Sequence, residues 1–384
     1  MSVRTFYCDH NASAPLLPEA RDAIVAALSL SGNPSSVHGP GRALRALIDG
    51  ARDAVAALAG ARREEVVFTG SATEAITQAI VGGARHFRPD RIVVSAGEHM
   101  AVLKSAELTG LPLVTIGLEP NGRIDLAALS AEVTRSMVAG ETLLIALHLV
   151  NNETGVIQPV EEVERLVGPT PHVLFVDAVQ AFGKLDLGFA ARPADMMAIS
   201  AHKIGGPAGA GALLMKSHCD DIRLIPGGGQ ESNRRGGTES AALLAGFGAA
   251  ARAFPGRYQE ANVPALIASF EQDLRALQPD VVIFGEGATR MGNVTNFALR
   301  GLNNAVALMA LDLQGVAVSS GSACSSGKVA MSHVLKAMGV PDDLRQAALR
   351  VSLGWTSTSE DGQAAAKTLS QIVARQRARA GQAA

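Results

Sequence analysis

Short apolar runs recur through the first two thirds of the chain, separated by longer segments in which apolar residues return at helical spacing. Runs of four to eight apolar residues bounded by turn residues are typical of buried strands. Strands that alternate with helices in this way favour a mostly parallel sheet wrapped by helices, an α/β fold. The predicted strands are residues 66–69, 91–95, 142–149, 172–176, 196–199 and 211–215.

The pattern changes after a predicted helix at 239–253, which we expect to end near Pro255 because proline interrupts helices. In the remainder of the chain, predicted helices and strands are arranged as in a smaller α+β domain. The Ala- and Arg-rich tail after Gln376 is expected to fray. We therefore divide the chain into an N-terminal segment 1–15 that packs on the small domain, a large domain 16–254 and a small domain 255–384. The elements predicted in the small domain are helices at 265–277, 305–313 and 359–377 and strands at 281–284 and 294–298.

Charge and composition argue against several classes of protein. A net charge of −2 over 384 residues argues against a nucleic-acid-binding surface as the main feature. The cysteines, Cys8, Cys219 and Cys324, are too few and too scattered for a disulfide framework or a four-cysteine metal site. Asp9 interrupts any apolar signal-peptide region, and no uncharged run is long enough for a membrane helix. We expect a cytoplasmic protein with no membrane association.

The first candidate for chemistry is Lys203, the last residue of the sequence Ser-Ala-His-Lys that follows the apolar run 196–199. Burial favours the neutral form of an amine, and a neutral amine can bond to an aldehyde. Asp177 ends another apolar run 26 residues upstream, so both side chains can open onto one pocket. Pyridoxal phosphate needs such a pair, a lysine for its aldehyde and a carboxylate to keep its ring nitrogen protonated. Taken singly, a surface lysine and a turn-capping aspartate are equally ordinary interpretations.

A candidate anion site lies in the first third of the chain. The predicted strand 66–69 leads into Gly-Ser-Ala-Thr-Glu from Gly70, which opens a helical pattern. Free N–H groups and the dipole at a helix start attract a phosphate, and Thr73 adds a hydroxyl. An ordinary N-cap, with Glu74 favouring the first turn, explains the same residues.

Three motifs carry a resemblance to a known family: Asn-Asn-Glu-Thr-Gly from Asn151, Asp-Ala-Val-Gln from Asp177, and Ser-Ala-His-Lys from Ser200. The sequence resembles the class V aminotransferase family, and more narrowly the NifS/IscS-type cysteine desulfurases. The likeness runs from about Tyr7 to about Trp355, with the motifs in the family's order and spacing. It implies a pyridoxal-phosphate-dependent fold of type I with a large domain around a mostly parallel, seven-stranded sheet.

The resemblance also implies roles for the residues around the cofactor. His99 matches the histidine that stacks on the cofactor ring and shuttles protons, and Thr238 matches a threonine that reaches the phosphate in the partner subunit of a homodimer. The cofactor phosphate is held in the family by residues that match Ala72, Thr73, Ser200 and His202, and the ring substituents by residues that match Asn152 and Gln180. Asp177 and Lys203 keep the roles argued above.

Cys324 stands in a run of small residues, Ser-Ser-Gly-Ser-Ala-Cys-Ser-Ser-Gly from Ser319, which favours an exposed loop rather than a core position. An inert cysteine in a polar loop remains the ordinary alternative. The match to the family makes Cys324 the sulfur acceptor that becomes a persulfide. The resemblance further implies transfer of this sulfur to an acceptor or scaffold protein in iron–sulfur cluster assembly, with Cys324 as a transient iron–sulfur ligand.

Arg350 precedes Val-Ser-Leu-Gly, and its planar guanidinium suits the carboxylate that every amino-acid substrate presents. A salt bridge at a strand end is the competing interpretation. The resemblance makes Arg350 the anchor of the substrate carboxylate, with Asn152 beside it. The implied reaction takes L-cysteine to L-alanine, with Lys203 moving the α-proton and Cys324 taking the sulfur.

Three other interpretations of the sequence compete with that of a cysteine desulfurase. Another class V enzyme, such as a selenocysteine lyase or a small-amino-acid aminotransferase, would share most of these residues, although an aminotransferase does not need Cys324. A non-catalytic relative would require a broken position, and Lys203, Asp177, Cys324 and Arg350 are all present. A P-loop protein, suggested by the glycines from Gly227, fails because no Gly-Lys-Ser/Thr ending follows.

Overall fold

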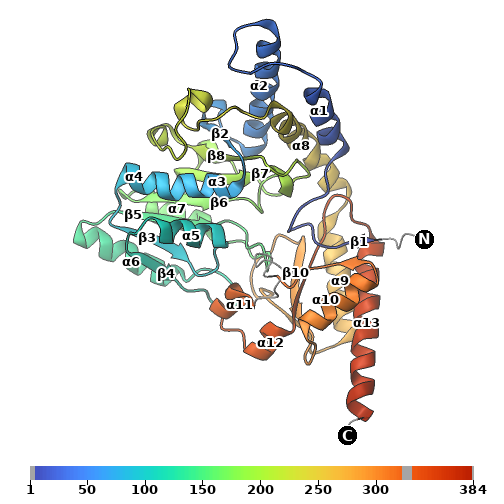
Figure 1. Ribbon diagram of the computed structural model, residues 1–384. Helices are drawn as coiled ribbons and strands as arrows, with labels where there is room; N and C mark the ends of the chain where they lie inside the picture. The colour runs from blue at the N-terminus through green and yellow to red at the C-terminus, as the bar shows by residue number, and fades with distance from the viewer. Residues whose placement is uncertain (1–4, 322–330, 383–384) are drawn as a thin grey trace.

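The computed structural model describes residues 5–321 and 331–382 and is built around a seven-stranded sheet (Figure 1). Its strands lie in the order β2-β8-β7-β6-β5-β3-β4, and β8 alone among them runs antiparallel to its neighbours. The predicted mostly parallel sheet is thereby confirmed. The strands are β2 (Val66–Thr69), β3 (Arg91–Ser95), β4 (Leu113–Ile116), β5 (Leu143–His148), β6 (Val173–Asp177), β7 (Met196–Ser200) and β8 (Gly211–Met215).

Six of these strands match the sequence-based prediction to within one residue at each end. The exception is β4, which the sequence analysis missed. It is a four-residue edge strand that keeps Leu113 exposed, so it lacks the continuous apolar run by which the central strands were recognised.

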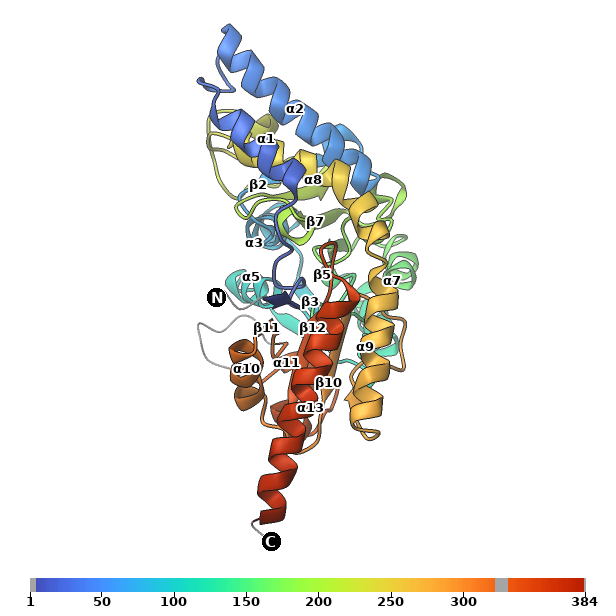
Figure 2. The ribbon, with the colours of Figure 1, turned by 90° about the vertical axis from the view of Figure 1, so that its right-hand side faces the viewer.

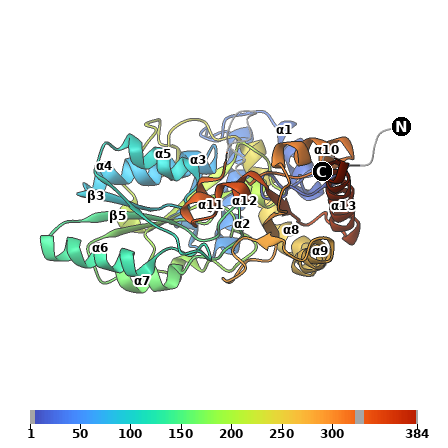
Figure 3. The ribbon, with the colours of Figure 1, turned by 90° about the horizontal axis from the view of Figure 1, so that it is seen from below.

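Helices cover both faces of this sheet, as the view from below shows (Figure 3). On one face, Ile76 and Val102 pack with the sheet residue Val94 in a buried cluster. On the other face, Val133 and Val163 join a second and larger buried cluster. The helices of this part are α1 (Pro18–Leu28), α2 (Gly39–Ala59), α3 (Ala72–Thr77), α4 (Gly83–Phe87), α5 (Met100–Leu108), α6 (Leu126–Ala139), α7 (Val160–Val167) and α8 (Ala241–Glu260).

The C-terminal part has a three-stranded antiparallel sheet in the order β12-β10-β9, and its helix α13 packs against α9 (Figure 2). The N-terminal strand β1 pairs in parallel with β11 from this part. None of the helices described for the chain is long and apolar enough to cross a membrane. The elements are β1 (Phe6–Tyr7), β9 (Val282–Ile283), β10 (Val294–Ala298), β11 (Val316–Ala317), β12 (Ala348–Ser352), α9 (Val263–Leu277), α10 (Asn304–Leu313), α11 (His333–Ala337), α12 (Asp342–Gln346) and α13 (Ser359–Gln382).

Two predicted helix ends were wrong. Helix α8 does not end near Pro255 but continues to Glu260 with the proline inside it. Phe254 is buried in the large core and stacks on Tyr258 at 5.3 Å between ring centroids, so packing on both sides of Pro255 offsets the missing backbone hydrogen bond. Helix α13 likewise continues past Gln376 to Gln382. The division of the chain at 1–15, 16–254 and 255–384 stays a prediction.

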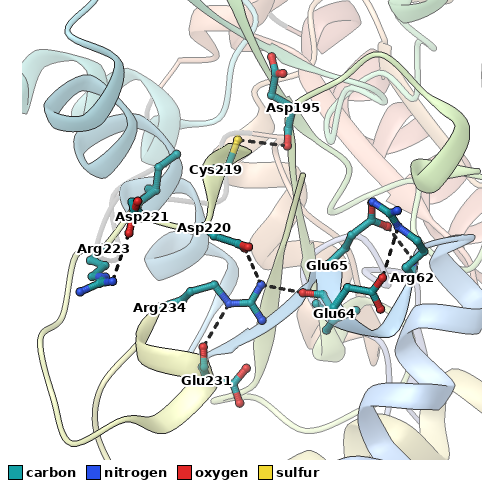
Figure 4. A network of polar contacts seen from close by, with 12 residues as sticks. Arg62, Glu64, Glu65, Asp195, Cys219, Asp220, Asp221, Arg223, Glu231 and Arg234 are labelled. Atoms are coloured by element: carbon teal, nitrogen blue, oxygen red, sulfur yellow. Dashed lines mark hydrogen bonds and ion pairs between the residues drawn. The ribbon is translucent and has the colours of Figure 1, made fainter. Parts of the chain in front are cut away.

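The loop between β8 and α8 is fastened to the large sheet by charged side chains (Figure 4). Arg234 donates to the backbone oxygen of Glu64 at 2.6 Å, to the Asp220 carboxylate at 3.0 Å and to the backbone oxygen of Glu231 at 3.1 Å. Three consecutive residues of this loop, Glu231, Ser232 and Asn233, have φ of 48°, 57° and 66°, in the left-handed region that non-glycine residues avoid. The contacts therefore hold the loop in a conformation that is unfavourable by itself.

Glu231 makes buried contacts that hold this loop in place, and its replacement is expected to destabilise the protein. Its carboxylate accepts two hydrogen bonds from Arg52, at 2.6 and 2.7 Å, and one from the Phe68 N–H at 2.8 Å, all buried. Glu231→Gln leaves the Arg52 charge buried without its partner and should lower the free energy of unfolding by about 3 kcal/mol. Urea unfolding measures this change, with Asp22→Asn in an exposed ion pair as the control. An equal stability of the two variants would contradict the prediction.

Candidate active site

A cavity of about 410 Å³ opens where β5, β6 and β7 end. Parallel strands place their carboxyl ends at one edge of the sheet, which is where α/β folds usually bind ligands. The cavity brings together residues that are far apart in the sequence. The sequence-predicted residues that line it are Ala72, Thr73, His99, Asn152, Asp177, Gln180, Ser200, His202, Lys203 and Arg350.

Lys203 ends a short 3-10 turn directly after β7 and points toward the N-terminal segment. Its ammonium group donates to the backbone oxygens of Asn11 at 2.5 Å and Ala12 at 2.8 Å. The side-chain amide of Gln180 donates to the same Asn11 oxygen at 3.0 Å. The N-terminal segment therefore forms one wall of the cavity and fixes the position of the lysine.

Asp177 is the last residue of β6 and is 7% exposed. Burial raises the pKa of its carboxyl group, while the Val179 N–H at 3.0 Å and the nearby His99 and His148 act against this rise. A buried carboxylate is stable only beside donors or positive charge. The site therefore suits a cationic ring nitrogen at this place.

His99 caps the start of α5, where its Nδ1 accepts a hydrogen bond from the Ala101 N–H at 3.1 Å. In the neutral ring the proton then lies on Nε2. The ring contributes to the cavity wall. Its backbone cap holds it in one orientation.

The end of the cavity near α3 is lined by small and polar groups. Ser71 caps α3, and the first N–H groups of that helix have no carbonyl one turn earlier in the helix. Gly211 lets β8 approach closely, because a Cβ there would lie 2.8 Å from the Ala72 nitrogen. Burial lowers the pKa of His202 to about 4, so its ring is neutral at pH 7 and can donate one hydrogen bond.

Arg350 lies on β12 and is 1% exposed. Its guanidinium donates to the Asp9 carboxylate at 2.7 Å and to the backbone oxygen of Asn152 at 3.1 Å. Its Nε is buried with no hydrogen-bond partner among the described residues. These contacts hold the guanidinium at the cavity, and its Nε–H group remains available to donate a hydrogen bond.

One predicted site residue, Thr238, is exposed and does not line this cavity. Cys324 lies outside the described residues, so the structure does not test its prediction. The other cysteines are buried, and burial raises the pKa of Cys8 to about 12 and raises that of Cys219 as well, which makes both poor nucleophiles.

The comparison with protein families decides to which family the chain belongs. The profile of the family described as Aminotransferase class-V matches residues 6–364. The chain belongs to the class-V aminotransferase family. Proteins of the class-V aminotransferase and cysteine desulfurase group depend on pyridoxal phosphate, and the fold found here is the fold type I of that group.

Several relatives within the family carry a more specific name. The chain is 36% identical to a protein of Trichormus azollae named cysteine desulfurase, over 98% of this chain and 94% of the relative. It is 37% identical to a cysteine desulfurase of Cereibacter sphaeroides, over 92% of each chain. Among solved structures it is similar to a NifS-like protein from Rickettsia africae ESF-5, with a TM-score of 0.86, 29% identity and coverage of 96% and 99%. A structure of SspA in complex with cysteine matches with a TM-score of 0.79 and 27% identity, over 92% of this chain and all of that one.

The residues of this class-V aminotransferase site fit pyridoxal phosphate. The buried side-chain oxygen of Gln180 has no hydrogen-bond partner among the described residues and is free to accept one from a ligand. Asp177 offers a carboxylate, Lys203 an amine, and the start of α3 offers N–H groups with the Thr73 hydroxyl at the same cavity. This donor set matches the ring nitrogen, aldehyde and phosphate of the cofactor.

Sequence reasoning missed two residues of this class-V aminotransferase site that make several contacts. Asn11 connects the walls of the cavity, since its amide donates to the Asn152 oxygen at 3.1 Å and accepts from Asn293 at 2.8 Å. His148 lines the cavity from the end of β5. The polar run around Asn11 near the chain start was a usable signal, whereas a single histidine ending an apolar run was not.

Proposed function

We propose that the protein is a pyridoxal-phosphate-dependent cysteine desulfurase, which converts L-cysteine to L-alanine and leaves the sulfur as a persulfide on Cys324. The observation that carries this proposal is the convergence of Lys203, Asp177 and Arg350 on one cavity. The names of the relatives and the cysteine in the similar SspA structure support it.

In this proposal each group of the cofactor has named partners. Lys203 holds the aldehyde, and Asp177 holds the ring nitrogen in its protonated form. Asn152 and Gln180 bind the ring substituents, and His99 lies against the ring. The phosphate is bound by Ala72, Thr73, Ser200 and His202. When bound, the cofactor withdraws electrons from the carbon atoms of the amino acid attached to it.

The protein side chains then have distinct tasks. Arg350 binds and orients the α-carboxylate of cysteine. The Lys203 amine takes the α-proton, and His99 moves protons at the cavity wall. The Cys324 thiolate attacks the substrate sulfur, so that an S–S bond forms and the C–S bond breaks. The electron pair of the broken bond stays on the β-carbon, which takes up a proton and becomes the methyl group of alanine.

The finer parts of the proposal concern partners. The exposed Thr238 is proposed to reach the cofactor phosphate in the partner subunit of a homodimer, which agrees with its position outside the cavity of its own chain. The persulfide is proposed to pass to an acceptor or scaffold protein in iron–sulfur cluster assembly, with Cys324 as a transient iron–sulfur ligand. Among the described residues no group of histidine, cysteine and acidic side chains could hold a metal ion. We further propose a cytoplasmic location, with no nucleic-acid partner.

An absorption spectrum combined with a product assay tests the proposal. The purified protein should absorb in the visible range and, on addition of L-cysteine with a thiol reductant, should release sulfide and alanine in equal amounts. A protein with the visible band that releases no alanine from L-cysteine, or that uses serine or alanine as amino donors, would point to an aminotransferase instead. L-selenocysteine, assayed in parallel, separates a selenocysteine lyase by its preference. A protein that cannot bind pyridoxal phosphate would overturn the assignment.

The role of Arg350 gives a separate prediction. Arg350→Lys keeps the charge but loses the two-point contact to a carboxylate, so KM for L-cysteine should rise by about 100-fold. The visible absorption band should persist, because the arginine is not assigned to the cofactor. Steady-state kinetics measures the change, with the exposed Arg300→Lys as the matched control. A KM for Arg350→Lys within threefold of the original value would contradict the assignment.

A further inference from the structure

A second and much smaller cavity also borders Lys203, which lines both cavities. Its volume is about 10 Å³, which is enough for one water molecule and for no larger ligand. Four polar side chains line it from segments that are remote in sequence: His10 in the N-terminal segment, Lys184 after β6, Tyr258 on α8 and Asn293 before β10. None of these four has a task in the mechanism proposed above.

Three of the four residues carry a buried polar atom that has no hydrogen-bond partner among the described residues. These atoms are His10 Nδ1, the Tyr258 hydroxyl oxygen and Asn293 Oδ1. His10 is 5% exposed and Asn293 is 0% exposed. Folded proteins leave few buried polar groups unpaired, because such a group has lost its hydrogen bond to water without a replacement. Three such atoms on the residues around one small cavity therefore indicate a polar ligand that pairs with them.

The unpaired atom of Asn293 is an acceptor. The amide nitrogen of Asn11 donates to the backbone oxygen of Asn152 at 3.1 Å, so Asn11 presents its side-chain oxygen to Asn293. Asn293 in turn uses its amide nitrogen to donate to that oxygen at 2.8 Å, and its own oxygen remains unpaired. An oxygen with a partial negative charge at the cavity disfavours an anion such as chloride as the ligand.

Lys184 disfavours a cation in the same cavity. Its ammonium group has three N–H donors, one of which donates to the backbone oxygen of Gln180 at 3.1 Å. Burial lowers the pKa of His10 to about 4, so its ring is neutral at pH 7. With the ring proton on Nε2, which lies 2.9 Å from the Thr356 hydroxyl, Nδ1 accepts a hydrogen bond, and the Tyr258 hydroxyl can donate one. A neutral molecule that both donates and accepts suits all four groups.

We propose that this cavity is a binding site for a single water molecule, which accepts hydrogen bonds from Lys184 and Tyr258 and donates to His10 and Asn293. A buried water commonly makes two to four such bonds, and it connects polar groups that do not reach one another directly. The water joins the N-terminal segment, the large domain and the segment before β10 at one point. It lies next to the wall that holds the catalytic lysine, because Asn11 contacts Asn293 through its side chain and Lys203 through its backbone oxygen.

A crystal structure of the full-length protein loaded with pyridoxal phosphate, at a resolution that shows ordered waters, tests the site directly. We expect one peak of electron density within about 3.2 Å of at least three of the four groups, without anomalous signal. No peak, a peak that contacts two or fewer of these groups, or the anomalous signal of a chloride ion would overturn the proposal. All four groups belong to the protein, so the result does not depend on whether the protein releases sulfide from L-cysteine.

The variant Tyr258→Phe provides an independent test in solution through the sign of its effect. If a water pairs with the Tyr258 hydroxyl, deletion of the hydroxyl removes a buried hydrogen bond, and Tm of the cofactor-loaded protein should fall by about 2 °C. A hydroxyl that has no partner is itself unfavourable, so an unchanged or higher Tm would contradict the bound water. The matched control is Tyr7→Phe, whose hydroxyl donates to the backbone oxygen of Ser13 at 2.8 Å and whose loss should lower Tm with or without the water.

Discussion

Lys203→Ala is expected to yield a protein without the visible absorption band and with turnover of L-cysteine reduced by at least about 10³-fold. In the proposed mechanism a single amine both holds the cofactor aldehyde and moves the α-proton, so its removal takes away both tasks at once. Lys184 lies close by, and burial and the Lys203 charge lower its pKa to about 7, but its ammonium is directed to the Gln180 oxygen at 3.1 Å. The spectrum and a sulfide assay measure the two effects on one sample.

The matched control is Lys104→Ala, which removes an exposed lysine paired with Glu107 and should change neither spectrum nor rate. Circular dichroism shows whether each variant is folded. A folded Lys203→Ala protein that still forms the visible band and turns over cysteine would refute the assignment of the lysine.

Cys324→Ser is expected to abolish sulfide release, by roughly 10³-fold or more, while the visible absorption band is retained. A hydroxyl is a far weaker nucleophile toward sulfur than a thiolate, so the substrate C–S bond stays intact. Mass spectrometry of the unaltered protein after brief exposure to L-cysteine, without reductant, should show a mass increase of about one sulfur atom (about 32 Da) on Cys324.

Cys219→Ser serves as the matched control, because Cys219 is buried and its raised pKa keeps it protonated. It should keep both the band and the sulfide release. Retention of full sulfide release by Cys324→Ser, or an added sulfur found on Cys219 and not on Cys324, would rule out Cys324 as the sulfur acceptor.

Elements that leave a strong local pattern in the sequence were predicted correctly, and elements with a weak pattern were missed. Central strands such as β6 and β7 are buried on both faces, and so they appear as continuous apolar runs in the sequence. The edge strand β4 shows no such run and was missed. Pro255 is a local signal for a helix end, yet the packing of Phe254 and Tyr258 on α8 outweighed it.

Recognition of the site residues depended on local sequence patterns in the same way. Asp177 was recognised because it ends an apolar run, and Lys203 because it follows one closely. Motif residues such as Asn152 and Thr73 were recognised through the family resemblance. Asn11 and Asp9 belong to the site through contacts with residues more than 100 positions away. His148 was missed because only the register of β5 and β6 brings it beside Asp177.

The sequence by itself therefore determined the fold class, the family and the residue types needed for chemistry on pyridoxal phosphate, because periodicity and motif spacing are local properties of a chain. The tertiary structure alone decided which walls close the cavity, how Asp9 and the Asn152 oxygen hold Arg350, and which buried charges lie near Asp177. Those features depend on distances between segments remote in sequence and on desolvation, and both arise only when the chain is packed.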